Sequence, residues 1–65
     1  MLTVKEWEKK NLDYDTYHYF NANGEEESFF INSEEKYKAH VLRVEIISSE
    51  WGEVAIYTDY VEKKN

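Results

Sequence analysis

Two histidines are the side chains of this sequence best suited to proton transfer near neutral pH. They are His18 and His40, and imidazole is the one side chain whose unperturbed pKa lies in that range. Covalent catalysis also needs a nucleophile and a third group that orients the base. The sequence has no cysteine, and neither histidine lies near a recognisable serine motif. We therefore interpret both as ordinary strand or strand-end residues and expect no enzyme activity.

Closely spaced carboxylates are the second chemically suggestive feature. Asp13 and Asp15, together with Glu25–Glu27, have the oxygen atoms that a hard cation prefers. The spacing of a twelve-residue calcium loop and its central glycine are absent, so a solvated acidic edge is the better interpretation. The two glycines, Gly24 and Gly52, fall in predicted turns and not in a phosphate-binding loop. The sequence thus predicts neither a metal nor a cofactor.

The charge distribution points to binding partners. Fourteen acidic and eight basic residues give a formal net charge of −6. Two stretches, Asn11–Glu35 and Val44–Glu62, contain twelve carboxylates and no lysine or arginine. Such a field repels nucleic acid and anionic lipid but attracts a basic protein surface. The alternative is that these carboxylates serve only solubility.

A short helix is predicted at Val4–Lys10. Thr3 and Glu6 have the spacing of a capping box, in which each side chain accepts a hydrogen bond from a backbone N–H at the start of the helix. Val4 and Trp7 then face inward. The helix is expected to end near Asn11.

A β-hairpin is predicted next. Its strands are Tyr14–Asn21 and Glu26–Ile31, and a two-residue Asn23–Gly24 turn places Phe20 opposite Glu27. Because successive side chains of a strand point to opposite faces of the sheet, both faces of this hairpin carry aromatic residues. One face carries His18, Phe20, Phe29 and Ile31, and the other carries Tyr17, Tyr19 and Phe30. This second face is either an exposed interface or the other side of a core.

The second half repeats the pattern. Ser33 followed by two glutamates predicts a helix cap, with a turn or two of helix through about Ala39. A strand follows at His40–Ile47, and its expected inward residues are Leu42, Val44 and Ile46. Glu53–Tyr60 completes a second hairpin, with Val54 and Ile56 inward. The predicted fold class is α+β, a four-stranded antiparallel sheet from two β-hairpins with one or two short helices, in the order α-β-β-α-β-β, forming a single domain over residues 1–65.

Trp51 lies between Glu50 and Gly52 in the predicted loop of the second hairpin. A tryptophan there either anchors an interface or folds back onto the sheet. The aromatic and acidic residues together give a candidate partner-binding set: Asp13, Asp15, Tyr17, Tyr19, Glu25, Glu26, Glu27, Phe30, Glu50 and Trp51.

The order of these segments resembles a known class of proteins. The opening Leu2–Trp7, the Asn23–Gly24 turn, the acidic helix start at Ser33 and the closing pair Val41–Ile47 and Val54–Thr58 are similar to small accessory proteins carried by phages and prophages of Gram-positive bacteria. The Tyr14–Phe20 strand and the Trp51 loop do not match. The resemblance implies modulation of host machinery or of host defence, including anti-CRISPR activity, and it implies no catalytic residues.

The sequence is compatible with three functions. The leading hypothesis is an inhibitor or modulator that binds a basic, nucleic-acid-handling host protein, with carboxylates mimicking phosphates. The alternative is a structural or assembly protein, such as a homodimer, that self-associates through the Tyr17, Tyr19 and Phe30 face. The second alternative is a nucleic-acid-binding module that uses the basic residues of Lys36–Arg43, although base stacking on the aromatic face lacks neighbouring cations. The start of the chain lacks an apolar signal region, so we expect the cytoplasm of a bacterial host and no membrane partner.

Overall fold

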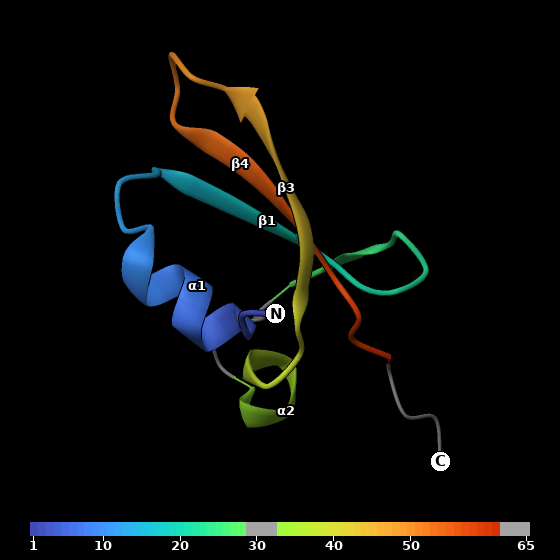
Figure 1. The fold of residues 1–65 in the computed structure, drawn as a ribbon. Coiled ribbons are helices and arrows are strands. Elements are labelled where there is room, and N and C mark those ends of the chain that lie inside the picture. Colours follow the sequence, from blue (N-terminus) through green and yellow to red (C-terminus); the bar gives the residue numbers. More distant parts are fainter. Residues whose placement is uncertain (29–32, 62–65) are drawn as a thin grey trace.

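The computed structural model describes residues 1–28 and 33–61. In this part of the chain, two short helices pack with a four-stranded mixed sheet, which makes the fold α+β (Figure 1). The elements along the chain are α1 (Val4–Lys10), β1 (Thr16–Phe20), β2 (Glu26–Glu27), α2 (Glu34–Tyr37), β3 (Val41–Ser48) and β4 (Glu53–Thr58).

Helix α1 begins with the capping box that the sequence predicts. The Thr3 hydroxyl accepts a hydrogen bond from the Glu6 backbone N–H at 3.2 Å, and the Glu6 carboxylate accepts one from the Thr3 backbone N–H at 3.0 Å. At the other end, the Asn11 side chain donates to the Trp7 carbonyl at 2.8 Å. Val4 and Trp7 are buried, so the predicted helix and its inward face are confirmed. The predicted Ser33 cap of α2 is also confirmed.

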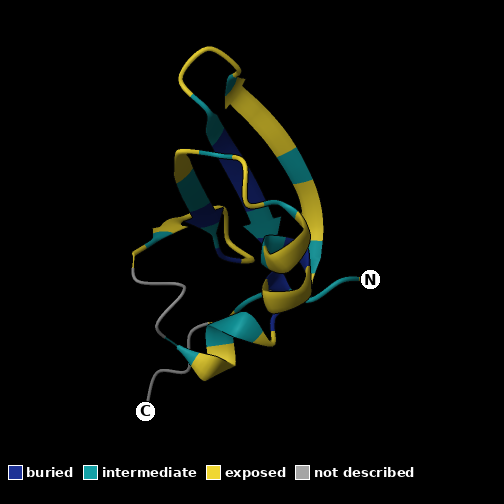
Figure 2. Ribbon diagram, turned by 90° about the vertical axis from the view of Figure 1, so that its left-hand side faces the viewer, coloured by how far each residue is buried: buried dark blue, intermediate teal, exposed yellow. Residues whose placement is uncertain are grey.

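The sheet has the order β2-β1-β4-β3. Each hairpin is antiparallel, but β1 and β4 join the two hairpins in parallel, from Thr16 opposite Glu53 to Phe20 opposite Tyr57. The prediction of a purely antiparallel sheet is therefore wrong. Alternation of apolar and polar residues predicts the strands of each hairpin, but it does not predict which strand of one hairpin pairs with which strand of the other. Strand β4 is central, and its consecutive residues Val54, Ala55 and Ile56 are all buried (Figure 2).

The first hairpin turn is one residue longer than predicted. Tyr19 lies opposite Glu27 and Phe20 opposite Glu26, so the predicted pairing of Phe20 with Glu27 is wrong. The Asn21 side-chain carbonyl accepts hydrogen bonds from the N–H groups of Asn23 and Glu25, and the Asn21 N–H donates to the Glu25 carbonyl. These bonds close a three-residue loop whose last residue, Gly24, has φ +81°, as such loops require. The predicted strand residues Phe29, Phe30 and Ile31 lie outside the described residues.

The core lies between α1 and one face of the sheet. Its buried members are Val4, Trp7, Tyr19, Ala39, Val54 and Ile56. Val41 and Val44 of β3 pack against it, but Leu42 and Ile46, which we expected to be inward, are 54% and 52% exposed. Ile46 lies opposite buried Val54 and so points to the core face, but neither helix buries it. Leu42 is the extra residue where the register shifts between Val41 and Arg43.

Candidate partner-binding surface

The parallel pairing of β1 with β4 brings together two segments that are distant in sequence. The backbone N–H groups of Asp15 and Thr16 both donate to the Gly52 carbonyl, at 2.8 and 3.1 Å. The loop before β1 therefore lies against the turn between β3 and β4. We call this part of the molecule the acidic end, and its residues are Leu12, Asp13, Asp15, Glu50, Trp51 and Glu53.

Gly52 makes this close approach possible. It has φ +64°, a conformation that L-residues with side chains rarely adopt. A Cβ atom at this position would come 3.0 Å from both the backbone nitrogen and a carboxylate oxygen of Asp15. Gly52 thus allows the backbone conformation of the turn, and its lack of a side chain leaves room for the Asp15 backbone.

The acidic end combines unpaired charge with exposed apolar surface. None of its four carboxylates makes an ion pair with a described lysine, arginine or histidine. Leu12 is 72% exposed and Trp51 is 69% exposed. The Trp51 backbone N–H donates to the Ser48 hydroxyl, which fixes the turn while the ring stays in solvent. Of the two interpretations of Trp51, folding back onto the sheet is therefore wrong.

The other predicted acidic residues lie at the opposite end of β1. Glu26 is 3.3 Å from the His18 ring, and Glu27 is 3.4 Å from the Lys36 ammonium group and accepts a hydrogen bond from the Asn21 side chain. Glu25 is exposed in the turn. The predicted acidic residues therefore lie in two separate groups. In the group at this end, Glu26 and Glu27 contact side chains of the same molecule.

The predicted tyrosine face is mostly part of the core. Tyr19 is only 4% exposed and its hydroxyl donates to Glu8 at 2.7 Å, while the half-buried Tyr17 donates to the Asn11 carbonyl. Trp7 and Tyr14 complete a chain of ring contacts with centroids about 6 Å apart. Of the two alternatives for this face, the exposed interface is wrong for Tyr17 and Tyr19 and the other side of a core is confirmed, because Tyr19 is buried in the core with Val4 and Trp7 of α1 and Tyr17 packs against it. Phe30 lies outside the described residues.

The basic residues of Lys36–Arg43 are largely matched by carboxylates. Besides its contact with Glu27, Lys36 lies 5.6 Å from the Tyr60 ring centroid. The His40 ring is 3.2 Å from Asp59 and the Arg43 guanidinium is 3.2 Å from Glu45. This pairing weakens the case for a phosphate-binding patch.

Sequence reasoning missed an aromatic row on the other face of the sheet. The rings of Phe20 and Tyr57 stack with centroids 4.8 Å apart, and the Arg43 guanidinium lies 4.2 Å from the Tyr57 centroid. The parallel register places Phe20 opposite Tyr57. Alternation from the predicted inward residues Val54 and Ile56 would have placed Tyr57 on this face, but the contact depends on the parallel pairing.

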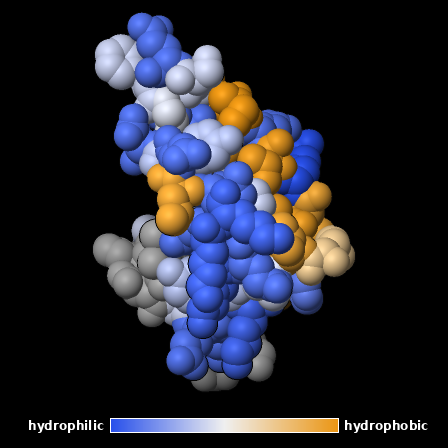
Figure 3. Space-filling model, turned by 60° about the vertical axis from the view of Figure 1, so that its left-hand side comes forward, coloured by the Kyte–Doolittle hydropathy of each residue, from blue (hydrophilic) through white to orange (hydrophobic). Residues whose placement is uncertain are grey.

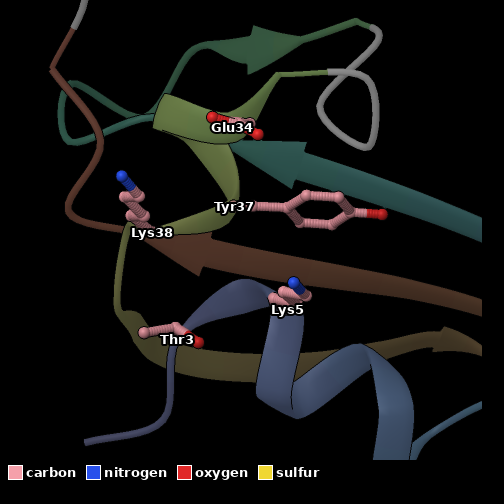
Figure 4. A pocket seen from close by; sticks show the side chains of 5 residues that line it. All are labelled: Thr3, Lys5, Glu34, Tyr37 and Lys38. Atoms are coloured by element: carbon pink, nitrogen blue, oxygen red, sulfur yellow. The ribbon is translucent and has the colours of Figure 1, made fainter.

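A hollow of about 340 Å³ lies between the start of α1 and helix α2 (Figure 4). It is lined by Thr3, Lys5, Glu34, Tyr37 and Lys38, so both positive and negative side chains face it.

Two tyrosines near Glu8 have raised pKa values. Burial is the larger cause for both; the charge of Glu8 adds to it at Tyr37, and the hydrogen bond to Glu8 adds to it at Tyr19. Both phenols therefore stay protonated at neutral pH and are hydrogen-bond donors, not bases.

Within residues 1–28 and 33–61, no three histidine, aspartate or glutamate side chains come together as a metal site. The helices of the same part of the chain are too short and polar to cross a membrane. Comparison of the chain with protein-family models, curated proteins and solved structures finds no match.

Proposed function

We propose that this protein acts by binding a partner protein that has a basic surface, and that the acidic end is the contact. The observation that carries the proposal is that the acidic end holds four carboxylates without an ion pair to any described lysine, arginine or histidine, together with two exposed apolar side chains. Unpaired negative charge steers a basic partner into the encounter, and an exposed tryptophan is the type of residue that supplies binding energy once water is excluded.

The partner class follows from the charge. Proteins that handle nucleic acid present cations spaced to receive phosphates, and the carboxylates of the acidic end would occupy those positions. Such occupation inhibits or modulates the partner by competing with its nucleic acid. The resemblance to phage accessory proteins supports a bacterial host protein or a defence system, including CRISPR effectors, as the target. We therefore propose a small anti-defence type inhibitor that acts inside the host cell.

Matched variants test whether the acidic end is the contact. Tagged protein is used to capture partners from a bacterial host lysate, with mass spectrometry to identify them. Asp13→Asn with Glu50→Gln removes two charges from the acidic end, and Trp51→Ser removes its exposed ring. Glu25→Gln with Glu35→Gln is the control, because both residues are exposed, lie elsewhere and change the net charge equally.

We expect the acidic-end variants to lose a partner that the control retains. Binding of that partner should weaken as salt is added, and an excess of single- or double-stranded nucleic acid should displace it. Equal capture by both charge variants would refute the acidic end as the contact. An affinity that does not respond to ionic strength would refute phosphate mimicry.

A further inference from the structure

Strand β3 has an outer edge that is only partly covered. At its start, the Val41 N–H donates to the Leu2 carbonyl and the Val4 N–H donates to the Ala39 carbonyl, each at 2.8 Å. After Val41, no described strand pairs with this edge. Register shifts lie between Val41 and Arg43 and between Ile46 and Ser48, so Arg43–Ile46 is the regular part of the edge. Unpaired backbone groups of this kind are a template for another strand.

The side chains along this edge are apolar and exposed. Leu42, Ile46 and Ile47 are each more than half exposed although the molecule has few residues with which to build a core. Apolar side chains gather in Figure 3 along the flank where β3 lies, beside the polar surface of α1. Exposed apolar side chains next to an unpaired strand edge are typical of an association surface.

The charges on the edge indicate what it associates with. Arg43 and Glu45 lie opposite Tyr57 and Ala55, on the face away from the core, and their side chains are 3.2 Å apart yet 62% and 51% exposed, so each can also meet a charge on a second copy. We propose that a second copy of this chain pairs with β3 in antiparallel orientation, about a two-fold axis at Val44. Arg43 then lies opposite the partner's Glu45, and Leu42 lies opposite the partner's Ile46. The edge is therefore complementary to itself.

The charge pattern selects this register. Moving the axis by one residue centres it on Arg43 or on Glu45 and places two like charges directly opposite each other, which is unfavourable in a sheet. The Leu2 carbonyl already occupies the Val41 N–H and Leu42 lies at a register shift, so the regular part of the new ladder covers only Arg43–Glu45 in each copy, with Leu42 and Ile46 flanking it. A ladder this short gives a reversible dimer whose population depends on protein concentration. Neither Arg43 nor Glu45 belongs to the acidic end, so the dimer stands independently of the proposed function.

Sedimentation equilibrium tests the dimer over about a hundredfold range of protein concentration. The wild-type mass should rise from 7.9 kDa toward twice that value. Arg43→Glu and Glu45→Lys should each stay monomeric, because each sets like charges opposite one another. An equimolar mixture of the two variants should regain the dimer, as should a chain that carries both substitutions.

Glu35→Lys is the control for Glu45→Lys, since it makes the same charge change at an exposed residue of α2 and should dimerise like the wild type. Circular dichroism checks that each variant folds, and if Arg43→Glu does not, Glu45→Lys and the doubly substituted chain still decide the question. A wild-type protein that stays monomeric throughout would overturn the proposal. So would single variants that dimerise as well as the wild type, or a mixture that does not associate.

Discussion

Replacement of Gly52 by alanine tests how closely the loop before β1 is joined to the β3–β4 turn. Gly52 and Gly24 both have positive φ, so alanine at either position costs about 1–2 kcal/mol of backbone strain. The two sites differ in their surroundings. A Cβ at Gly24 meets nothing within 4 Å, whereas a Cβ at Gly52 comes 3.0 Å from the Asp15 backbone nitrogen.

This contact sets the expected difference. Overpacking against backbone typically adds about 1–3 kcal/mol, so Gly52→Ala should cost about 2–5 kcal/mol and Gly24→Ala about 1–2 kcal/mol. A domain of 65 residues has a total stability of roughly 3–10 kcal/mol, so the first change removes a large share of it.

Urea unfolding followed by the fluorescence of buried Trp7 measures both free energies of unfolding. Hydrogen exchange gives a local readout, because the Asp15 and Thr16 amides should exchange faster in Gly52→Ala and not in Gly24→Ala. Equal destabilisation by the two substitutions, with unchanged exchange at Asp15, would refute the close approach and with it the geometry of the acidic end.

Three further predictions concern the caps and the core. Thr3→Ala should lower the free energy of unfolding by about 1 kcal/mol in urea titrations, because Glu6 loses its capping partner; an unchanged midpoint would contradict the capping role. Hydrogen bonds from Thr3 lower the pKa of Glu6 below 4.5. The resulting stability is therefore present above pH 4.5 and is lost as the pH falls through the lowered pKa, so acid titration of Glu6→Gln should show a shallower loss than the wild type. Burial raises the pKa of Tyr19 above 10.0, so its contribution is present below pH 10 and is lost as the pH rises further. Tyr19→Phe should reduce that alkaline loss, and tyrosinate absorbance of the folded variant should lack a late-titrating phenol that the wild type shows.

The helices could be predicted from the sequence because their signals are local. A capping box needs only Thr3, Glu6 and the intervening backbone, and Ser33 caps α2 in the same way. The first turn shows the limit of such signals. Asn23–Gly24 indicates a hairpin, but the Asn21 side chain binds two backbone N–H groups and closes a longer loop, which shifts the register by one residue.

Non-local pairing explains the remaining differences. The parallel pairing of β1 with β4 cannot be predicted from the sequence of either strand. It nevertheless brings Asp15 against the turn at Gly52 and so forms the acidic end. Burial likewise depends on what covers a face. Tyr19 lies under α1 and is buried, whereas Ile46 points to the same face of the sheet and is not.

The position of β4 in the chain has a consequence for how the protein folds. This strand is the last described one, yet it lies at the centre of the sheet and holds β1 to β3. Its partner residues in β1 precede it by 37 positions, from Thr16 to Glu53, so closing the sheet requires ordering a long intervening segment. A nascent chain therefore exposes β1 and β3 without their common neighbour until residues 53–58 emerge, and folding is expected to be slower than for a helical bundle of equal length.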